Sequence, residues 1–216
     1  MAKPLIIIGA GDHAKVLLDI LLDQGENVIG LTDKSVQKGT VIYDVPVIGN
    51  DEVILKYKKE EIELVNGIGS VRDTTLREKL FCFFKNKGYS FKTVVHNSAV
   101  ISKKAKIKEG AQILAGSIIN TEAEVGVNTI INTKVSIDHG CKIGSHCHIA
   151  PGCVLSGCVT VGNGTHIGTG SSIIQGVKIG SNVLIGAGSV VLKDIADNSK
   201  AYGVPAKITK QMTGRG

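Results

Sequence analysis

Residues 137–166 read IDHGCK-IGSHCH-IAPGCV-LSGCVT-VGNGTH, five six-residue units that each begin with an aliphatic residue. The same register runs without insertion from Val95 to Val191, so that seventeen positions in a row are Val, Ile or Leu. A period of six fits neither an amphipathic helix nor a single half-buried strand. The segment is therefore predicted to be a repeat array in which each unit contributes one short strand and one corner.

Small or modest side chains stand two residues before these aliphatic positions, and they are predicted to point inward as well. Cys141, Cys147 and Cys153 are three of them, and we interpret them as reduced thiols that act as small hydrophobic side chains. Glycine directly follows several of the aliphatics, as expected where the chain turns a corner or two backbones approach closely. Three units would close a triangular coil of about 18 residues, with coils stacked about 4.8 Å apart through parallel pairing.

The repeats, for example IGSHCH at 143–148, resemble those of the hexapeptide-repeat acyltransferases. The resemblance implies a left-handed parallel β-helix. Its handedness rests on the resemblance alone, because parallel crossovers otherwise favour the right-handed form. Residues 95–192 are assigned to this β-helix, and residues 193–216 to a C-terminal cap and tail.

Residues 1–94 alternate apolar runs with helical patterns, which predicts a small, Rossmann-like α/β domain with a parallel sheet. The expected strands are Leu5–Ile8, Val28–Leu31, Val45–Ile48, Leu64–Ile68 and Phe91–Val95. The expected helices are Lys15–Leu22, one that starts at Asp51, and Leu76–Phe84.

A glycine-rich turn, Gly9-x-Gly11-x-x-Ala14, joins the first predicted strand to the first helix. Glycine at a helix N-terminus lets a phosphate approach unpaired backbone N–H groups. Asp33 follows about twenty residues later at the end of the next strand, where an acidic side chain can accept hydrogen bonds from a ribose or a base. Because the domain holds only about half of a dinucleotide fold, one nucleotide is easier to place than two. A tight turn without a ligand is the alternative.

As a whole, the chain resembles the bacterial sialic acid O-acetyltransferases and UDP-4-amino-sugar N-acetyltransferases. The resemblance assigns substrate binding to Gly11, Asp12, His13, Asp33, Lys34 and Gly69. Asp12-His13 replaces the Gly-His pair that is common in this motif. Near the C-terminus, GVPAK at 203–207 resembles the Gly-x-Pro-Ala-Lys signature that closes many of these enzymes.

Four histidines lie at repeat positions that the fold does not need: His139, His146, His148 and His166. Acetyl transfer requires a base and a donor to the oxyanion, and imidazole suits the first role near neutral pH. By the resemblance, His139 is the general base and His148 binds the thioester region of the co-substrate. The family usually has an acid directly after the base, where this chain has Gly140. Asp138, a neighbouring subunit's side chain or water would then orient His139.

The resemblance also implies acetyl-CoA as co-substrate, held between adjacent rods of a homotrimer with active sites between subunits. Gly157, one predicted coil beyond His139, is expected to donate its N–H to the oxyanion. Thr169 and Ala187 match further cofactor-contacting positions. The predicted activity is acetyl transfer from acetyl-CoA to an amino group of a nucleotide-activated sugar in bacterial surface polysaccharide biosynthesis, with O-acetylation as the alternative.

Two alternatives belong to other classes of protein. A catalytically weak, nucleotide-sugar-binding trimer would be consistent with Gly140. A zinc-dependent protein like the γ-type carbonic anhydrases would have the same fold and three histidine ligands. That family's pattern requires a histidine two coils before a histidine pair, but Gly110 and Gln112 stand 36 residues before His146 and His148. No metal is therefore expected.

Composition restricts the partners and the location of the chain. The formal charge of +6 comes from dispersed lysines with one cluster, Lys103, Lys104, Lys106 and Lys108. This cluster is either a solvated face or a site for a polyanionic cofactor. Because no aromatic residues are interleaved with these lysines, no nucleic-acid partner is expected. The apolar run Leu5–Ile8 is too short for a signal peptide or a membrane span, so we expect no membrane insertion and a cytoplasmic location.

Overall fold

The computed structural model describes residues 3–71 and 73–211, and the chain divides into two compact units. The first unit extends to Ser70 and resumes at Leu76–Val94. The second takes Val71–Thr75 and the chain from Val95 onward. Residues 212–216 of the predicted tail lie outside the described residues. Among the helices of the described residues, none is long and apolar enough to cross a membrane.

The first unit is an α/β domain with a five-stranded sheet in the order β3-β4-β2-β1-β5. Strands β1, β2, β4 and β5 are parallel, and β3 runs antiparallel to β4. The strands are β1 (Leu5–Ile8), β2 (Val28–Thr32), β3 (Val41–Ile42), β4 (Val45–Gly49) and β5 (Glu63–Asn66). The helices are α1 (Asp12–Asp23), α2 (Thr75–Asn86) and the 3-10 helix η1 (Asp51–Lys56).

Two predicted boundaries near the glycine-rich turn were wrong. Helix α1 begins at Asp12, three residues before the predicted start, because the extended N-cap residue Gly11 leads directly into the helix. Strand β5 ends at Asn66 and not at Ile68. The reason is Gly67, where an added Cβ would lie 2.6 Å from the carbonyl oxygen of Ile8. The chain thus turns tightly against the end of β1.

The predicted strand Phe91–Val95 was also wrong as a single element. Phe91 forms only an isolated parallel bridge with Leu64. Val94–Val95 is a separate strand, β6, which pairs within the sheets of the second unit.

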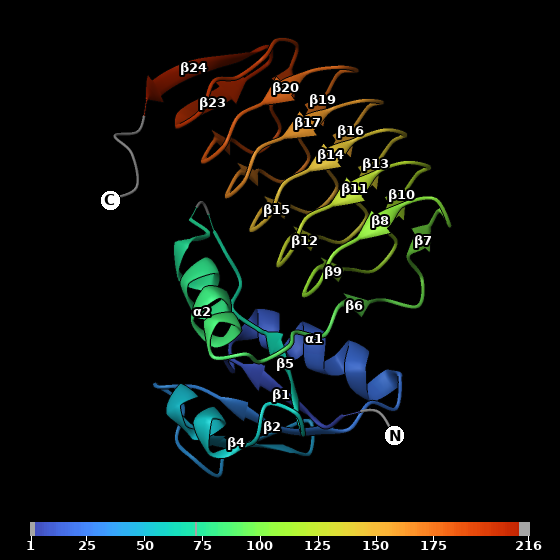
Figure 1. Ribbon diagram of the computed structural model, residues 1–216. Helices are drawn as coiled ribbons and strands as arrows, with labels where there is room; N and C mark the ends of the chain where they lie inside the picture. The colour runs from blue at the N-terminus through green and yellow to red at the C-terminus, as the bar shows by residue number, and fades with distance from the viewer. Residues whose placement is uncertain (1–2, 72, 212–216) are drawn as a thin grey trace. The chain divides into compact units, whose positions relative to one another are not determined.

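The second unit is the predicted left-handed parallel β-helix (Figure 1). Each of the seventeen predicted aliphatic positions ends one two-residue strand, from β6 to β22. The strands are β6 (Val94–Val95), β7 (Val100–Ile101), β8 (Lys106–Ile107), β9 (Gln112–Ile113), β10 (Ile118–Ile119), β11 (Glu124–Val125), β12 (Ile130–Ile131), β13 (Ser136–Ile137), β14 (Lys142–Ile143), β15 (His148–Ile149), β16 (Val154–Leu155), β17 (Thr160–Val161), β18 (His166–Ile167), β19 (Ser172–Ile173), β20 (Lys178–Ile179), β21 (Leu184–Ile185) and β22 (Val190–Val191).

These strands form three parallel sheets, one for each face of the coil. We call them the β13 sheet (β7, β10, β13, β16, β19, β22), the β14 sheet (β8, β11, β14, β17, β20) and the β15 sheet (β6, β9, β12, β15, β18, β21). A hairpin of β23 (Ser199–Gly203) and β24 (Ala206–Gln211) extends the β15 sheet beyond β21. Residues on neighbouring coils of one sheet pair directly, as Ile130 does with His148.

The small inward positions do more than fill the narrow core. Cys141, Cys147 and Cys153 are fully buried, and each thiol lies 3.1 to 3.2 Å from a carbonyl oxygen fifteen residues further on. Burial raises the pKa of the Cys153 thiol to about 11, so this group stays protonated and can donate. Inward Cys, Ser and Thr side chains therefore connect one coil to the next.

Glycines in the β-helix, which we also call the rod, have two separate roles. A Cβ on Gly126 would lie 2.5 Å from the backbone of Gly144, one coil further on, so glycine directly after an aliphatic permits close stacking of coils. The bend comes two residues later, where Gly140 and His146 have φ values of +66° and +58°. The prediction that a glycine directly after an aliphatic residue lets two backbones approach closely is therefore confirmed. The prediction that the chain bends at this same glycine is wrong.

Candidate active site

The first unit contains a cavity of about 440 Å³ at the C-terminal ends of β1, β2 and β5. Two predicted substrate residues, Asp33 and Lys34, line it. The complete lining is Gly9, Thr32, Asp33, Lys34, Ser35, Asp51, Ile68, Leu76 and Leu80. The cavity thus opens where ligands commonly bind in parallel α/β sheets.

The other four predicted substrate residues lie outside the lining of this cavity. Gly11 caps α1 without any side-chain hydrogen bond, and the exposed Asp12 pairs with Lys15 at 3.1 Å. His13 lies against Gly69, where an added Cβ would be 3.1 Å from the His13 Cβ. The structure therefore brings the glycine-rich turn and the segment around Gly69 together.

Asp33 fastens the glycine-rich turn to the end of β2. Its Oδ2 accepts the backbone N–H of Ala10 at 3.0 Å, and its Oδ1 accepts those of Ser35 and Val36 at 2.7 and 3.3 Å. Burial acts to raise the pKa of Asp33, but these three N–H donors hold the pKa below its ordinary value. The Asp33 carboxylate therefore has a structural role that the sequence pattern did not predict. Because the Ala10 N–H donates to this carboxylate, it is not available to a ligand phosphate in this structure.

His139 and Gly157 lie together at the corner that follows the β13 sheet. The His139 side chain is exposed, and its imidazole packs against the backbone of Gly157 in the next coil. A Cβ on Gly157 would lie 2.5 Å from both Cε1 and Nε2 of this ring. Within residues 3–71 and 73–211, no acceptor pairs with the N–H of Gly157. A potential base and an available N–H donor therefore share one corner.

Asp138 contacts the backbone of His139. Its Oδ1 accepts the backbone N–H of His139 at 2.7 Å and an Nδ2 proton of Asn120 at 3.1 Å. In the described part of the chain, no hydrogen bond reaches the His139 imidazole. Asp138 therefore holds the backbone of this corner, and the contact with Gly157 restricts the orientation of the His139 ring.

Gly140 occupies the left-handed position of this corner, with φ +66°. An added Cβ there would lie 3.2 Å from the Cys158 Sγ. An acidic residue at this position would have to adopt a backbone conformation that favours glycine. The same position one coil earlier and one coil later is held by Glu122 and Cys158, each with φ +61°, so the left-handed conformation alone does not require glycine after His139.

His148 lies in β15, is buried, and has a partner that the sequence analysis missed. The Oδ1 of Asn132 accepts the N–H of Thr133 at 2.7 Å, so the other amide atom, 3.0 Å from the His148 Nε2, is the donor Nδ2. Nε2 must then accept, which places the imidazole proton on Nδ1. The only sequence signal was a polar residue at a position where later coils have Ala150, Gly168 and Gly186.

One chain does not bring all the predicted rod residues together. His139 and His148 are nine residues apart in a coil of 18, so they lie on different faces. Gly157 shares the corner of His139, whereas Thr169 and Ala187 follow the β15 sheet that contains His148. We call these two groups the base half-site (His139, Gly157) and the carrier half-site (His148, Thr169, Ala187).

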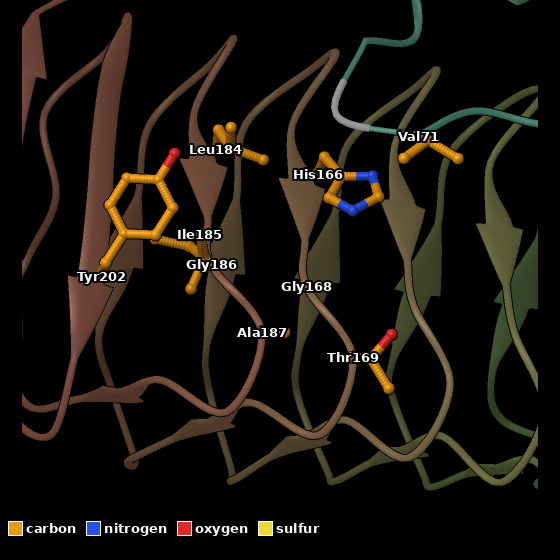
Figure 2. A pocket seen from close by; sticks show the side chains of 9 residues that line it. All are labelled: Val71, His166, Gly168, Thr169, Leu184, Ile185, Gly186, Ala187 and Tyr202. Carbon is orange, nitrogen blue, oxygen red and sulfur yellow. The ribbon is translucent and has the colours of Figure 1, made fainter.

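A cavity of about 340 Å³ in the second unit lies at the carrier half-site (Figure 2). Its lining is Val71, His166, Gly168, Thr169, Leu184, Ile185, Gly186, Ala187 and Tyr202. Thr169 and Ala187 are exposed there, and their backbone N–H groups have no acceptor among the described residues. Two of the four predicted cofactor residues thus border one cavity, while His148 and Gly157 do not line it.

His166 lines this cavity, although it was not among the predicted cofactor-binding residues. Its ring meets that of His148 edge to face, with 4.9 Å between the centroids and an interplanar angle of 86°. The side chain is 8% exposed, and its Nδ1 has no hydrogen-bond partner in the described residues. Burial lowers the pKa of His166 to about 4, so the ring is neutral at neutral pH.

This lowered pKa predicts an acid sensitivity. An unfolded chain holds a proton on His166 below about pH 6.5, whereas the folded chain does so only below about pH 4. The free energy of unfolding should therefore decrease as the pH falls through this window. Thermal unfolding at pH 7 and pH 4.5 should show a larger loss of Tm for the wild type than for His166→Phe. Equal losses in the two proteins would contradict this prediction.

Metal ligands are not clustered in the described part of the chain. No group of three or more His, Cys, Asp or Glu side chains there could hold a metal ion.

Family models and solved structures match both parts of the chain. Residues 4–82 match the model described as the PglD N-terminal domain, and residues 158–193 match the one described as bacterial transferase hexapeptide (six repeats). No curated protein sequence matches the chain.

Three similar solved structures span almost the whole chain. One is a histidine-to-asparagine mutant of perosamine N-acetyltransferase from Caulobacter crescentus, solved in complex with CoA and GDP-perosamine. It is 36% identical to this chain with a TM-score of 0.90, and the match covers 97% of this chain and 98% of that one. The acetyltransferase domain of PglB from Neisseria gonorrhoeae, in complex with acetyl coenzyme A, has 29% identity, coverage of 96% and 100%, and a TM-score of 0.89. WeeI from Acinetobacter baumannii, at 22% identity, coverage of 96% and 100% and a TM-score of 0.86, shares the fold.

Proposed function

The chain belongs to the hexapeptide-repeat sugar acyltransferases, and we propose accordingly that it transfers an acetyl group from acetyl-CoA to an amino group of a nucleotide-activated sugar. The observation that carries this proposal is the near full-length similarity to an N-acetyltransferase solved with both CoA and a GDP-linked sugar. Both parts of this chain supply a matching feature. The first unit has a cavity beside a glycine-rich turn. The second unit has a histidine ring beside a backbone N–H, and neither is hydrogen-bonded to another of the described residues.

We propose His139 as the general base. Its imidazole accepts a proton from the sugar amine while the amine nitrogen forms a bond to the thioester carbonyl carbon. The N–H of Gly157 donates to the oxyanion that develops on this carbonyl. When the carbon–sulfur bond breaks, His139 returns the proton to the leaving sulfur. Acetyl-CoA supplies the activated acetyl group.

The carrier half-site fits an extended ligand that contains amides. Thr169 and Ala187 line one cavity, and no described residue accepts their backbone N–H groups. Leu184 and Tyr202 give this cavity apolar walls. Carbonyl oxygens of the CoA arm would satisfy such donors, and its methyl groups would lie on the apolar walls.

The chain further fits a homotrimer in which the two half-sites come from different subunits. The outward face of the β13 sheet exposes Val100, Ile118 and Val154 by 64%, 43% and 45%. Ile174 and Leu192, at the corner after this sheet, are also exposed. A row of exposed apolar side chains is typical of an interface. Because His139 follows the same sheet, a neighbouring subunit on this face would supply the carrier half-site to the base half-site.

The first-unit cavity is the proposed site of the nucleotide-linked sugar. The test offers acetyl-CoA with GDP-, UDP- and dTDP-linked 4-amino sugars and with CMP-sialic acid, and measures release of free thiol and the mass of the product. We expect one class of nucleotide-linked 4-amino sugar to gain one acetyl group on nitrogen. Acetylation of CMP-sialic acid alone would favour an O-acetyltransferase. Tight binding of a nucleotide sugar with no transfer would favour the catalytically weak binding trimer.

A further inference from the structure

His166, one of the residues that line the cavity of the carrier half-site, has a buried ring nitrogen without a hydrogen-bond partner among the described residues. His166 is more than nine-tenths buried, yet no described residue forms a hydrogen bond with its Nδ1. Rings of other buried or half-buried histidines are paired, His148 with Asn132 and His146 with Asn128. An unpaired buried polar group is unfavourable unless a ligand or an ordered water satisfies it.

The cavity that His166 lines also offers two backbone donors. His166 lines the cavity with Thr169 and Ala187, whose N–H groups also have no acceptor in the described part of the chain (Figure 2). A ligand that satisfies all three groups must present two acceptors and one group that pairs with an imidazole nitrogen. A chain with repeated amides has both, because each amide contributes one carbonyl oxygen and one N–H.

We propose that His166 binds the pantetheine arm of CoA by pairing its Nδ1 with an amide of that arm, while Thr169 and Ala187 donate to the arm's carbonyl oxygens. The inference rests on the proposed acetyl-CoA-dependent function. Because the ring is neutral at neutral pH, one of its nitrogens can accept and the other can donate. The edge-to-face contact with His148 connects this arm site to the residue assigned to the thioester region.

The contact with His148 predicts how substitutions at position 166 should behave. Phenylalanine preserves an aromatic ring for His148 but removes both nitrogens. Asparagine loses the ring but keeps a polar atom close to the place of Nδ1. Comparing the two variants separates binding of the arm from packing against His148.

The experiment measures binding of CoA, pantetheine and adenosine 3′,5′-bisphosphate by calorimetry. For His166→Phe, we expect the Kd values of CoA and pantetheine to rise about 5- to 10-fold, as for the loss of one hydrogen bond, with the bisphosphate unaffected. His166→Asn should keep CoA affinity within about threefold of wild type. His146→Asn, at a left-handed corner that suits asparagine, is the matched control and should bind all three probes normally.

Two results would overturn this inference while leaving the proposed function intact. One is wild-type CoA affinity in His166→Phe. The other is an equal loss of affinity for CoA and for the bisphosphate, which would indicate a general distortion of the site. Failure of the wild-type chain to bind CoA would overturn the proposed function, and this inference with it. In steady state, the KM for acetyl-CoA should rise in His166→Phe, while the KM for the nucleotide sugar stays unchanged.

Discussion

Replacing His139 with alanine is expected to lower kcat/KM for acetyl transfer by roughly 10³-fold, the usual range for loss of a general base. The side chain is exposed, and no described residue forms a hydrogen bond with its ring, so Tm should stay close to the wild-type value. The measurement is the initial rate of thiol release from acetyl-CoA with the preferred sugar, alongside a melting curve.

His146→Asn is the matched control for this substitution. It removes an imidazole from the next corner of the rod, where φ is +58° and asparagine is well tolerated. Its activity should remain within about twofold of wild type, as for a substitution away from the site. If His139→Ala kept a tenth or more of wild-type activity, His139 would not be the base.

Replacing Gly157 with alanine should have the second largest effect. The new Cβ would lie 2.5 Å from Cε1 and Nε2 of His139, so the ring must move while the backbone N–H of residue 157 stays in place. Displacing a reacting group by about 1 Å can lower the rate about 10²-fold. We expect a loss in kcat of that order. Tm should change little, because the displaced atoms are the free end of an exposed side chain.

The matched control is Gly116→Ala in an earlier coil of the rod. Gly116 has φ +67°, and an added Cβ meets only the Lys134 side chain at 3.5 Å. Alanine there should cost about 1–2 kcal/mol of unfolding free energy and lower Tm by a few degrees, without loss of activity. An active Gly157→Ala enzyme would show that the contact between Gly157 and His139 does not position the base.

The sequence predicted the rod well because each part of its pattern has a local physical cause. A buried aliphatic every six residues, with a small residue two positions earlier, determines the three-sheet coil almost independently of distant contacts. The glycine pattern was harder to interpret. Close approach between coils and left-handed turns both favour glycine, and only the structure separates Gly126 from Gly140.

The site could be predicted less completely, because its geometry depends on which corner each residue occupies. His139 and His148 are nine residues apart, which is half a coil and places them on different faces of one chain. The family resemblance, in contrast, assigns both residues to one active site. The partner of His148, Asn132, was missed because its role depends on a contact across coils. In the first unit, the hydrogen bonds that Asp33 accepts from backbone N–H groups could not be predicted either. A carboxylate at the end of a strand can bind a ligand or the backbone of a loop, and the sequence pattern is the same in both cases.

We propose that the active site combines His139 of one subunit with His148 of another. The most direct test mixes chains carrying His139→Ala with chains carrying His148→Ala under two different affinity tags, and isolates assemblies that contain both. Each variant alone should be nearly inactive. In every mixed trimer, one of the three sites would contain both histidines, so we expect about one third of wild-type activity. Mixed assemblies as inactive as either variant alone would contradict it.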